Sequence, residues 1–149
     1  MKHDLSEVKI IDFEYAAFGP EEYDLANIFN EMIVDNNHPY YPFIWAYFEN
    51  CLTFDEISSM LKQFLTLKYD YLQIKTESLE EYLNNHTEQH LKNFFRCALL
   101  NNLYWGIWAV LLIKEKDINN EVFNFGYVNT WMDLYEYTVN HPEFSKYLS

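Results

Sequence analysis

The stretch from Val8 to Asn27 reads VKIIDFEYAAFGPEEYDLAN, and it contains the most informative pattern in the chain. Its β-branched and aromatic start favours a strand. Side chains alternate between the faces of a strand, so Asp12 and Glu14 should project to the same side. Carboxylates this close repel each other unless a cation separates them or one is protonated. The pair therefore fits a Mg²⁺ site that substrate phosphates complete, or else the solvated end of a strand.

A second block, YWGIW at Tyr104–Trp108, extends the pattern. IDFEY at 11–15, the following AAFGPEEYDLANIFNEM and this second block resemble, in this order, segments of choline and ethanolamine kinases. That family belongs to the protein-kinase-like superfamily, together with the aminoglycoside phosphotransferases. The resemblance implies ATP-dependent phosphorylation of choline or ethanolamine, an early step of phospholipid synthesis. It also implies two cofactors or co-substrates, Mg²⁺ and ATP.

The resemblance assigns roles to the acidic residues. It implies that Asp12 holds Mg²⁺ on the nucleotide phosphates and that Glu14 is a further metal ligand. Asp24 matches a residue that supports the catalytic loop from beneath, which is a structural role. The base itself belongs to an HxDxxxxN loop upstream, and His3-Asp4 does not have its spacing. We therefore expect no catalytic base in this chain.

The resemblance also implies an amine pocket lined by Tyr15, Glu31, Trp105 and Trp108. Choline is a permanent cation without an N–H donor, so aromatic faces and carboxylates are the groups that recognise it. Trp105 and Trp108 are three residues apart and can share a helix face. Aromatic residues at helical spacing are also common in cores, and this alternative stays open.

Two positions depart from the family pattern. Asn36 stands where the family often has an aromatic residue, and Asn129-Thr130 falls where another pocket aromatic is expected. Tyr40, Tyr41 or Trp131 could compensate for these losses. An incomplete aromatic cage would bind a quaternary ammonium more weakly, so the choice between choline and ethanolamine stays open.

Composition limits the classes of partner. The chain has 149 residues, is 50% hydrophobic and carries a net charge of −13, without a basic stripe that could neutralise phosphates. This argues against nucleic-acid binding and against attachment to anionic membranes. An acidic field attracts a cationic substrate, but it also simply favours solubility. Two cysteines without metal or disulfide spacing, and no signal-peptide pattern, predict a cytoplasmic protein.

The hydrophobic pattern predicts a mainly α fold with a short N-terminal β element, the helical C-lobe of a protein-kinase-like fold. Thr53 and Glu56 form a capping-box pattern at the start of one helix. The apolar run at 97–113 is too short for a membrane span and predicts a core helix. The expected helices cover 23–34, 53–72, 87–114 and 120–140, with a helical turn or two in 43–51.

We expect residues 1–149 to form one domain, the C-terminal part of a kinase whose nucleotide lobe is absent, and to be inactive alone. A bare lobe interface would favour self-association into a homo-oligomer. Two alternatives remain: another small-molecule kinase of the same superfamily, and a remnant that binds an amine or a partner protein without chemistry.

Overall fold

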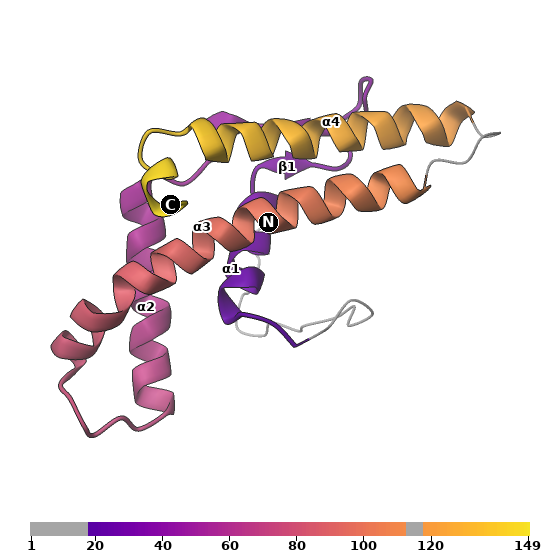
Figure 1. The fold of residues 1–149 in the computed structure, drawn as a ribbon. Helices are drawn as coiled ribbons and strands as arrows, with labels where there is room; N and C mark the ends of the chain where they lie inside the picture. Colours follow the sequence, from indigo (N-terminus) through magenta and orange to yellow (C-terminus); the bar gives the residue numbers. More distant parts are fainter. Residues whose placement is uncertain (1–17, 113–117) are drawn as a thin grey trace, which may run out of the picture.

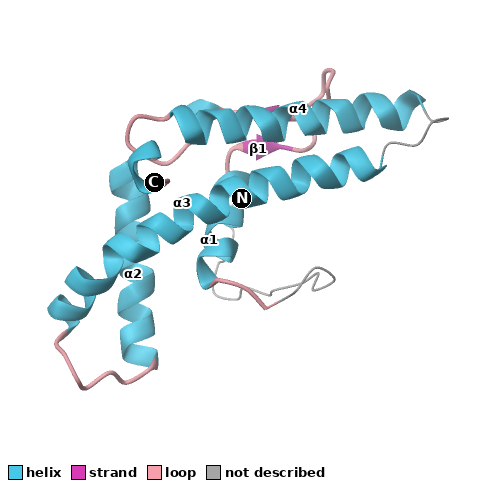
Figure 2. Ribbon diagram, viewed as in Figure 1, coloured by secondary structure: helices cyan, strands magenta, loops and turns pink. Residues whose placement is uncertain are grey.

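The computed structural model describes residues 18–112 and 118–149 (Figure 1). The strand predicted around Asp12, with Glu14 and Tyr15, lies outside the described residues. Helices dominate the described part (Figure 2), which confirms the mainly α prediction. They are α1 (Glu21–Glu31), α2 (Phe54–Tyr71), α3 (Leu79–Leu112) and α4 (Ile118–Asn140). Two short strands, β1 (Val34–Asp35) and β2 (Trp45–Ala46), and two 3₁₀ turns, η2 (Phe48–Asn50) and η3 (Ser145–Tyr147), complete the set.

The long helix α3 is the axis of the fold, because α1, α2 and α4 all pack against it. Figure 1 shows α4 running alongside the C-terminal half of α3, while α2 crosses its N-terminal half. Gly106 permits close approach of α3 and α4, since a Cβ there would lie 2.8 Å from Cε of Met132. Among the described helices, none has the length and apolar character needed to cross a membrane.

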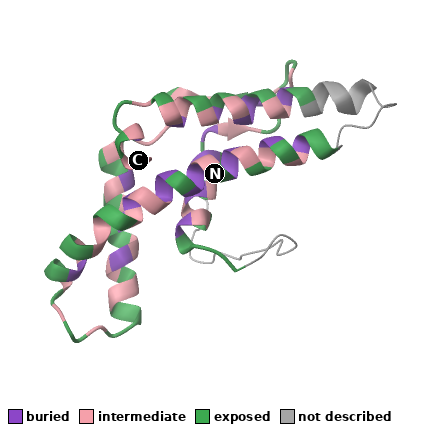
Figure 3. Cartoon of the chain, in the orientation of Figure 1, coloured by how far each residue is buried: buried purple, intermediate pink, exposed green. Residues whose placement is uncertain are grey.

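Buried residues follow the inward faces of the helices (Figure 3) and form two clusters. The larger cluster joins α1, α2, α3 and the C-terminal segment through aromatic side chains. Phe95 and Phe144 stack with ring centroids 4.7 Å apart, and Phe29 meets Phe94 edge-on at 5.5 Å. The smaller cluster contains Ile33, Ala46, Trp131 and Leu134, and it lies where the strands meet α4. Both clusters fix α1 and α4 relative to α3.

Side-chain caps explain where two helices begin. Thr53 and Glu56 form the predicted capping box, with Thr53 Oγ1 accepting from the Glu56 N–H and the Glu56 carboxylate accepting from the Thr53 N–H. Ser78 and Glu81 make the same pair of contacts, and α3 therefore begins at Leu79. The predicted start near Thr87 is wrong, because Thr87 lies inside α3 and donates to the Leu83 carbonyl oxygen at 2.6 Å.

The predictions for 23–34 and 43–51 also need correction. Helix α1 ends at Glu31, because Val34 pairs with Ala46 in an antiparallel register instead of continuing the helix. The segment 43–51 holds β2 and a 3₁₀ turn rather than an α-helical turn. Its start at Phe43 has φ 68°, a left-handed conformation that interrupts helical geometry. The last helix matches its prediction and ends at Asn140, before Pro142.

Candidate functional site

Glu31 ends α1 and presents its carboxylate at the surface. Asn36, just after β1, donates through Nδ2 to Glu31 Oε2 at 3.3 Å. The Asp35 side chain accepts the backbone N–H of Asn37 at 2.9 Å, which fixes the turn that carries Asn36. Partial burial raises the pKa of Glu31, and the hydrogen bond from Asn36 opposes this shift. The carboxylate is thus exposed on one side and sheltered on the other, as a group that receives a cation should be.

Four aromatic side chains from α3 and α4, which we call the aromatic group, pack against one another: Trp105, Trp108, Tyr127 and Trp131. The ring centroids of Trp105 and Trp108 are 5.6 Å apart, and those of Trp108 and Tyr127 are 6.0 Å apart. Trp131 contacts both Trp105 and Tyr127. Because α3 and α4 run side by side, residues distant in sequence form one continuous set of rings.

Tyr127 links the aromatic group to the acid at the end of α1. Burial raises the pKa of Tyr127 to about 12, a hydrogen bond with Trp131 lowers it, and the negative charge of Glu31 raises it further. A charge effect of this kind requires proximity, so Glu31 lies near Tyr127. Sequence reasoning did not include Tyr127 in the pocket. Its spacing of four residues from Trp131 was the available signal, because such residues share a helix face.

Trp105 is anchored from the core side by an asparagine network. Its Nε1 donates to Asn27 Oδ1 at 3.2 Å, and Asn101 Nδ2 donates to the same oxygen at 2.8 Å. Asn30 Nδ2 in turn donates to Asn101 Oδ1 at 2.9 Å, and both of these amides are fully buried. The network joins α1 to α3 and fixes the indole of Trp105. Trp105 is therefore partly a core residue, as the alternative interpretation of its spacing held.

The other predicted residues have separate positions. Asp24 lies exposed in the first turn of α1, so its supporting role stays a prediction. Trp131 is 0% exposed and cannot offer a face to a ligand. Tyr40 and Tyr41 are exposed on the loop before β2, where their rings contact His38 and Phe43. Asp12, Glu14 and Tyr15 lie outside the described residues.

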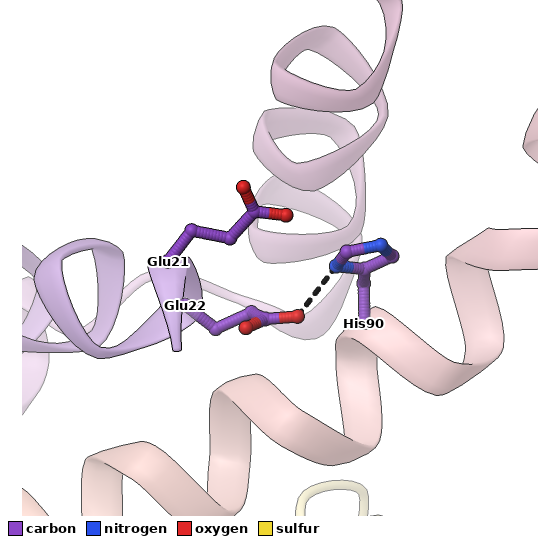
Figure 4. A group of neighbouring side chains, drawn as sticks. All are labelled: Glu21, Glu22 and His90. Atoms are coloured by element: carbon purple, nitrogen blue, oxygen red, sulfur yellow. Dashed lines mark ion pairs between the residues drawn. The ribbon is translucent and has the colours of Figure 1, made fainter. Parts of the chain in front are cut away.

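A second polar cluster joins the start of α1 to α2 and α3 (Figure 4). Glu22 is 3% exposed, and its carboxylate lies 2.5 Å from His90 Nδ1 and 3.2 Å from Asn93 Nδ2. Glu21, beside it, forms an ion pair with Lys68 of α2. Donor atoms of Glu21, Glu22 and His90 lie within 4.8 Å of one another, a spacing compatible with a metal ion. Lys68 pairs with Glu21, and His90 and Asn93 contact Glu22, so the cluster joins α1 to α2 and α3.

Comparison with known proteins identifies related sequences. The choline/ethanolamine kinase family profile matches residues 1–140. Choline kinase A2 of Caenorhabditis elegans is 26% identical over 140 residues, which are 94% of this chain and 30% of that protein. Probable choline kinase 3 of Arabidopsis thaliana is 34% identical over 104 residues, 70% of this chain and 27% of that protein. The human protein named choline/ethanolamine kinase is 26% identical over 121 residues, 80% of this chain and 28% of that protein.

The described residues form a mainly helical structure in which Glu31 of α1 lies near Tyr127 of the aromatic group. The chain belongs to the choline/ethanolamine kinase family. It spans only about 30% of the length of the curated relatives it matches.

Proposed function

We propose that this chain provides the amine-binding part of a choline/ethanolamine kinase, which phosphorylates choline or ethanolamine for phospholipid synthesis in the cytoplasm. The observation that carries the proposal is the proximity of Glu31 to Tyr127, whose ring in turn contacts Trp108 and Trp131. Glu31, Trp105 and Trp108 are residues that the sequence predicts to line the amine pocket. They come from separate helices, α1 and α3, and Tyr127 of α4 joins them.

In this proposal the ammonium group binds at Glu31. The ionised carboxylate attracts it, and the faces of Trp108 and Tyr127 add a cation–π attraction. The anchored indole of Trp105 closes the core side and keeps water away from that side of the site. Binding the ammonium end fixes the position of the hydroxyl group that is to be phosphorylated.

Asp12 and Glu14 are the residues that would hold Mg²⁺. Their carboxylate oxygens are the donors that this hard cation prefers, and they are two residues apart in sequence. When bound, Mg²⁺ neutralises the charge of the ATP phosphates. The general base is supplied in this proposal by residues outside the printed sequence, because no HxDxxxxN pattern occurs within it.

A second candidate is an amine-binding remnant without phosphoryl transfer. The observation in its favour is that no HxDxxxxN pattern occurs in the sequence. Both candidates share the amine site and differ only in whether the protein transfers a phosphoryl group.

The experiment incubates the purified chain with ATP, Mg²⁺ and either choline or ethanolamine. It follows phosphorylated amine by ³¹P NMR and amine binding by calorimetry. We expect amine binding without product. Product that is lost in Asp12→Asn but kept in Asp55→Asn, an exposed control on α2, would mean that this chain alone is a kinase. Absence of both binding and product would refute the proposal.

A further inference from the structure

The polar partner of Glu31 restricts the kind of ammonium that the site favours, an inference that rests on the proposed function. Asn36 Nδ2 donates to Glu31 Oε2 at 3.3 Å, so the amide lies directly against the carboxylate. Both residues are exposed at the surface, where a ligand can reach them. The Oδ1 of the same amide and the two carboxylate oxygens are all hydrogen-bond acceptors. One side of the site is therefore polar, and we call this side, formed by Glu31 and Asn36, the polar wall.

The aromatic side of the site is correspondingly small. Trp131 is fully buried, and Trp105 points its N–H inward to Asn27. Tyr104 is 45% exposed, but its ring packs edge-on against Trp105. Tyr127 is a half-buried ring near the acid, and Trp108, also half-buried, contacts it with ring centroids 6.0 Å apart. Two rings and a polar wall do not surround a cation as a cage of aromatic faces does.

We propose that the site prefers a primary ammonium, of the ethanolamine type, over a quaternary ammonium of the choline type. A primary ammonium has three N–H donors that can reach Glu31 and the Oδ1 of Asn36 while a ring covers its remaining side. A quaternary ammonium has no N–H, so it leaves these acceptors without hydrogen bonds while its methyl groups displace their water. Unpaired acceptors of this kind are costly, and a site built for N–H donors rejects an analogue that lacks them.

The experiment titrates the chain with ethanolamine, its N-methyl and N,N-dimethyl derivatives, and choline, using calorimetry. Each methyl group replaces one N–H, so affinity should fall stepwise. The loss should reach about tenfold or more between ethanolamine and choline, the scale of one charge-assisted hydrogen bond. The Asn36→Phe variant replaces the polar wall with a ring and should reverse this order. Asn37→Phe, at the exposed neighbouring position, should keep the wild-type order.

The outcomes separate the two proposals. Choline binding as tight as ethanolamine, or an order unchanged in Asn36→Phe, would overturn the preference while leaving the amine site intact. Failure of the wild-type chain to bind any of the four amines would overturn the amine site and the preference together.

Discussion

The asparagine network between α1 and α3 should contribute measurably to the free energy of unfolding. Asn101 is fully buried and makes two hydrogen bonds, accepting from Asn30 and donating to Asn27. Leucine at position 101 removes both hydrogen bonds. The buried Nδ2 of Asn30 is then left with a weaker partner. Each lost hydrogen bond costs about 1 kcal/mol, and the donor that keeps only a weaker partner adds up to about 2 kcal/mol, less than the full penalty of a buried unsatisfied group. Asn101→Leu should therefore lower the free energy of unfolding by about 2–4 kcal/mol.

The adjacent Asn102 is a matched control. It is also fully buried, but among the described residues neither of its amide atoms has a hydrogen-bond partner. Replacing an unpaired buried amide with an apolar side chain of similar shape is neutral or stabilising. Asn102→Leu should therefore keep or raise stability.

Thermal denaturation followed by circular dichroism compares the two variants with the wild-type chain. For a chain of this size each kcal/mol corresponds to about 2–4 °C in Tm, so the Asn101 variant should melt about 4–16 °C lower. Because Asn27 positions Trp105, its indole fluorescence should change as well. Equal effects of Asn101→Leu and Asn102→Leu would refute the network as the link between α1 and α3.

Three further substitutions test other parts of the structure. His90→Leu removes one of the two side chains that contact the buried carboxylate of Glu22 and leaves Asn93, so it should cost about 1–3 kcal/mol in urea denaturation. No measurable loss would contradict the role of the cluster in joining the helices. Gly126→Ala would place its Cβ against Pro42 of the loop before β2, and it should lower the free energy of unfolding by about 1–3 kcal/mol in thermal melting. Gly19→Ala, which has open space around it, should leave the free energy of unfolding unchanged. Burial raises the pKa of Glu31 above 4.5, so the folded state holds this proton to higher pH than the unfolded chain does. Stability should therefore fall as pH rises from 4.5 through the raised pKa, and Glu31→Gln should lack this fall in urea denaturation across that range.

Local signals in the sequence predicted the helices well where a cap marks them. Thr53 and Glu56 located the start of α2. Ser78 and Glu81 carry the same signal for α3, but the polar residues 73–85 around them predict a short helix and a connection instead. The pairing of Val34 with Ala46 depends on residues brought together by the fold, which helical periodicity does not reveal. It ended α1 earlier than its apolar pattern indicated.

The candidate site also combines residues that the sequence predicts with residues that only the fold brings together. Glu31, Trp105 and Trp108 were predicted through the family resemblance, since the spacing of the two tryptophans fits a core equally well. Tyr127 was missed because its proximity to Glu31 arises only when α4 packs against α3. The Glu22–His90 pair joins α1 to α3, and no local pattern in the sequence predicts it.

The central claim is that Glu31 and the aromatic group bind an ammonium ion. The most direct measurement is an NMR titration of the ¹⁵N-labelled chain with ethanolamine, following the indole N–H signals of the tryptophans. We expect the Trp108 signal to shift saturably in the wild-type chain and in Glu49→Gln, an exposed control that removes the same charge. We expect Glu31→Gln to abolish the shift. Equal affinity in the two glutamine variants would contradict the claim, because net charge alone would then explain the attraction.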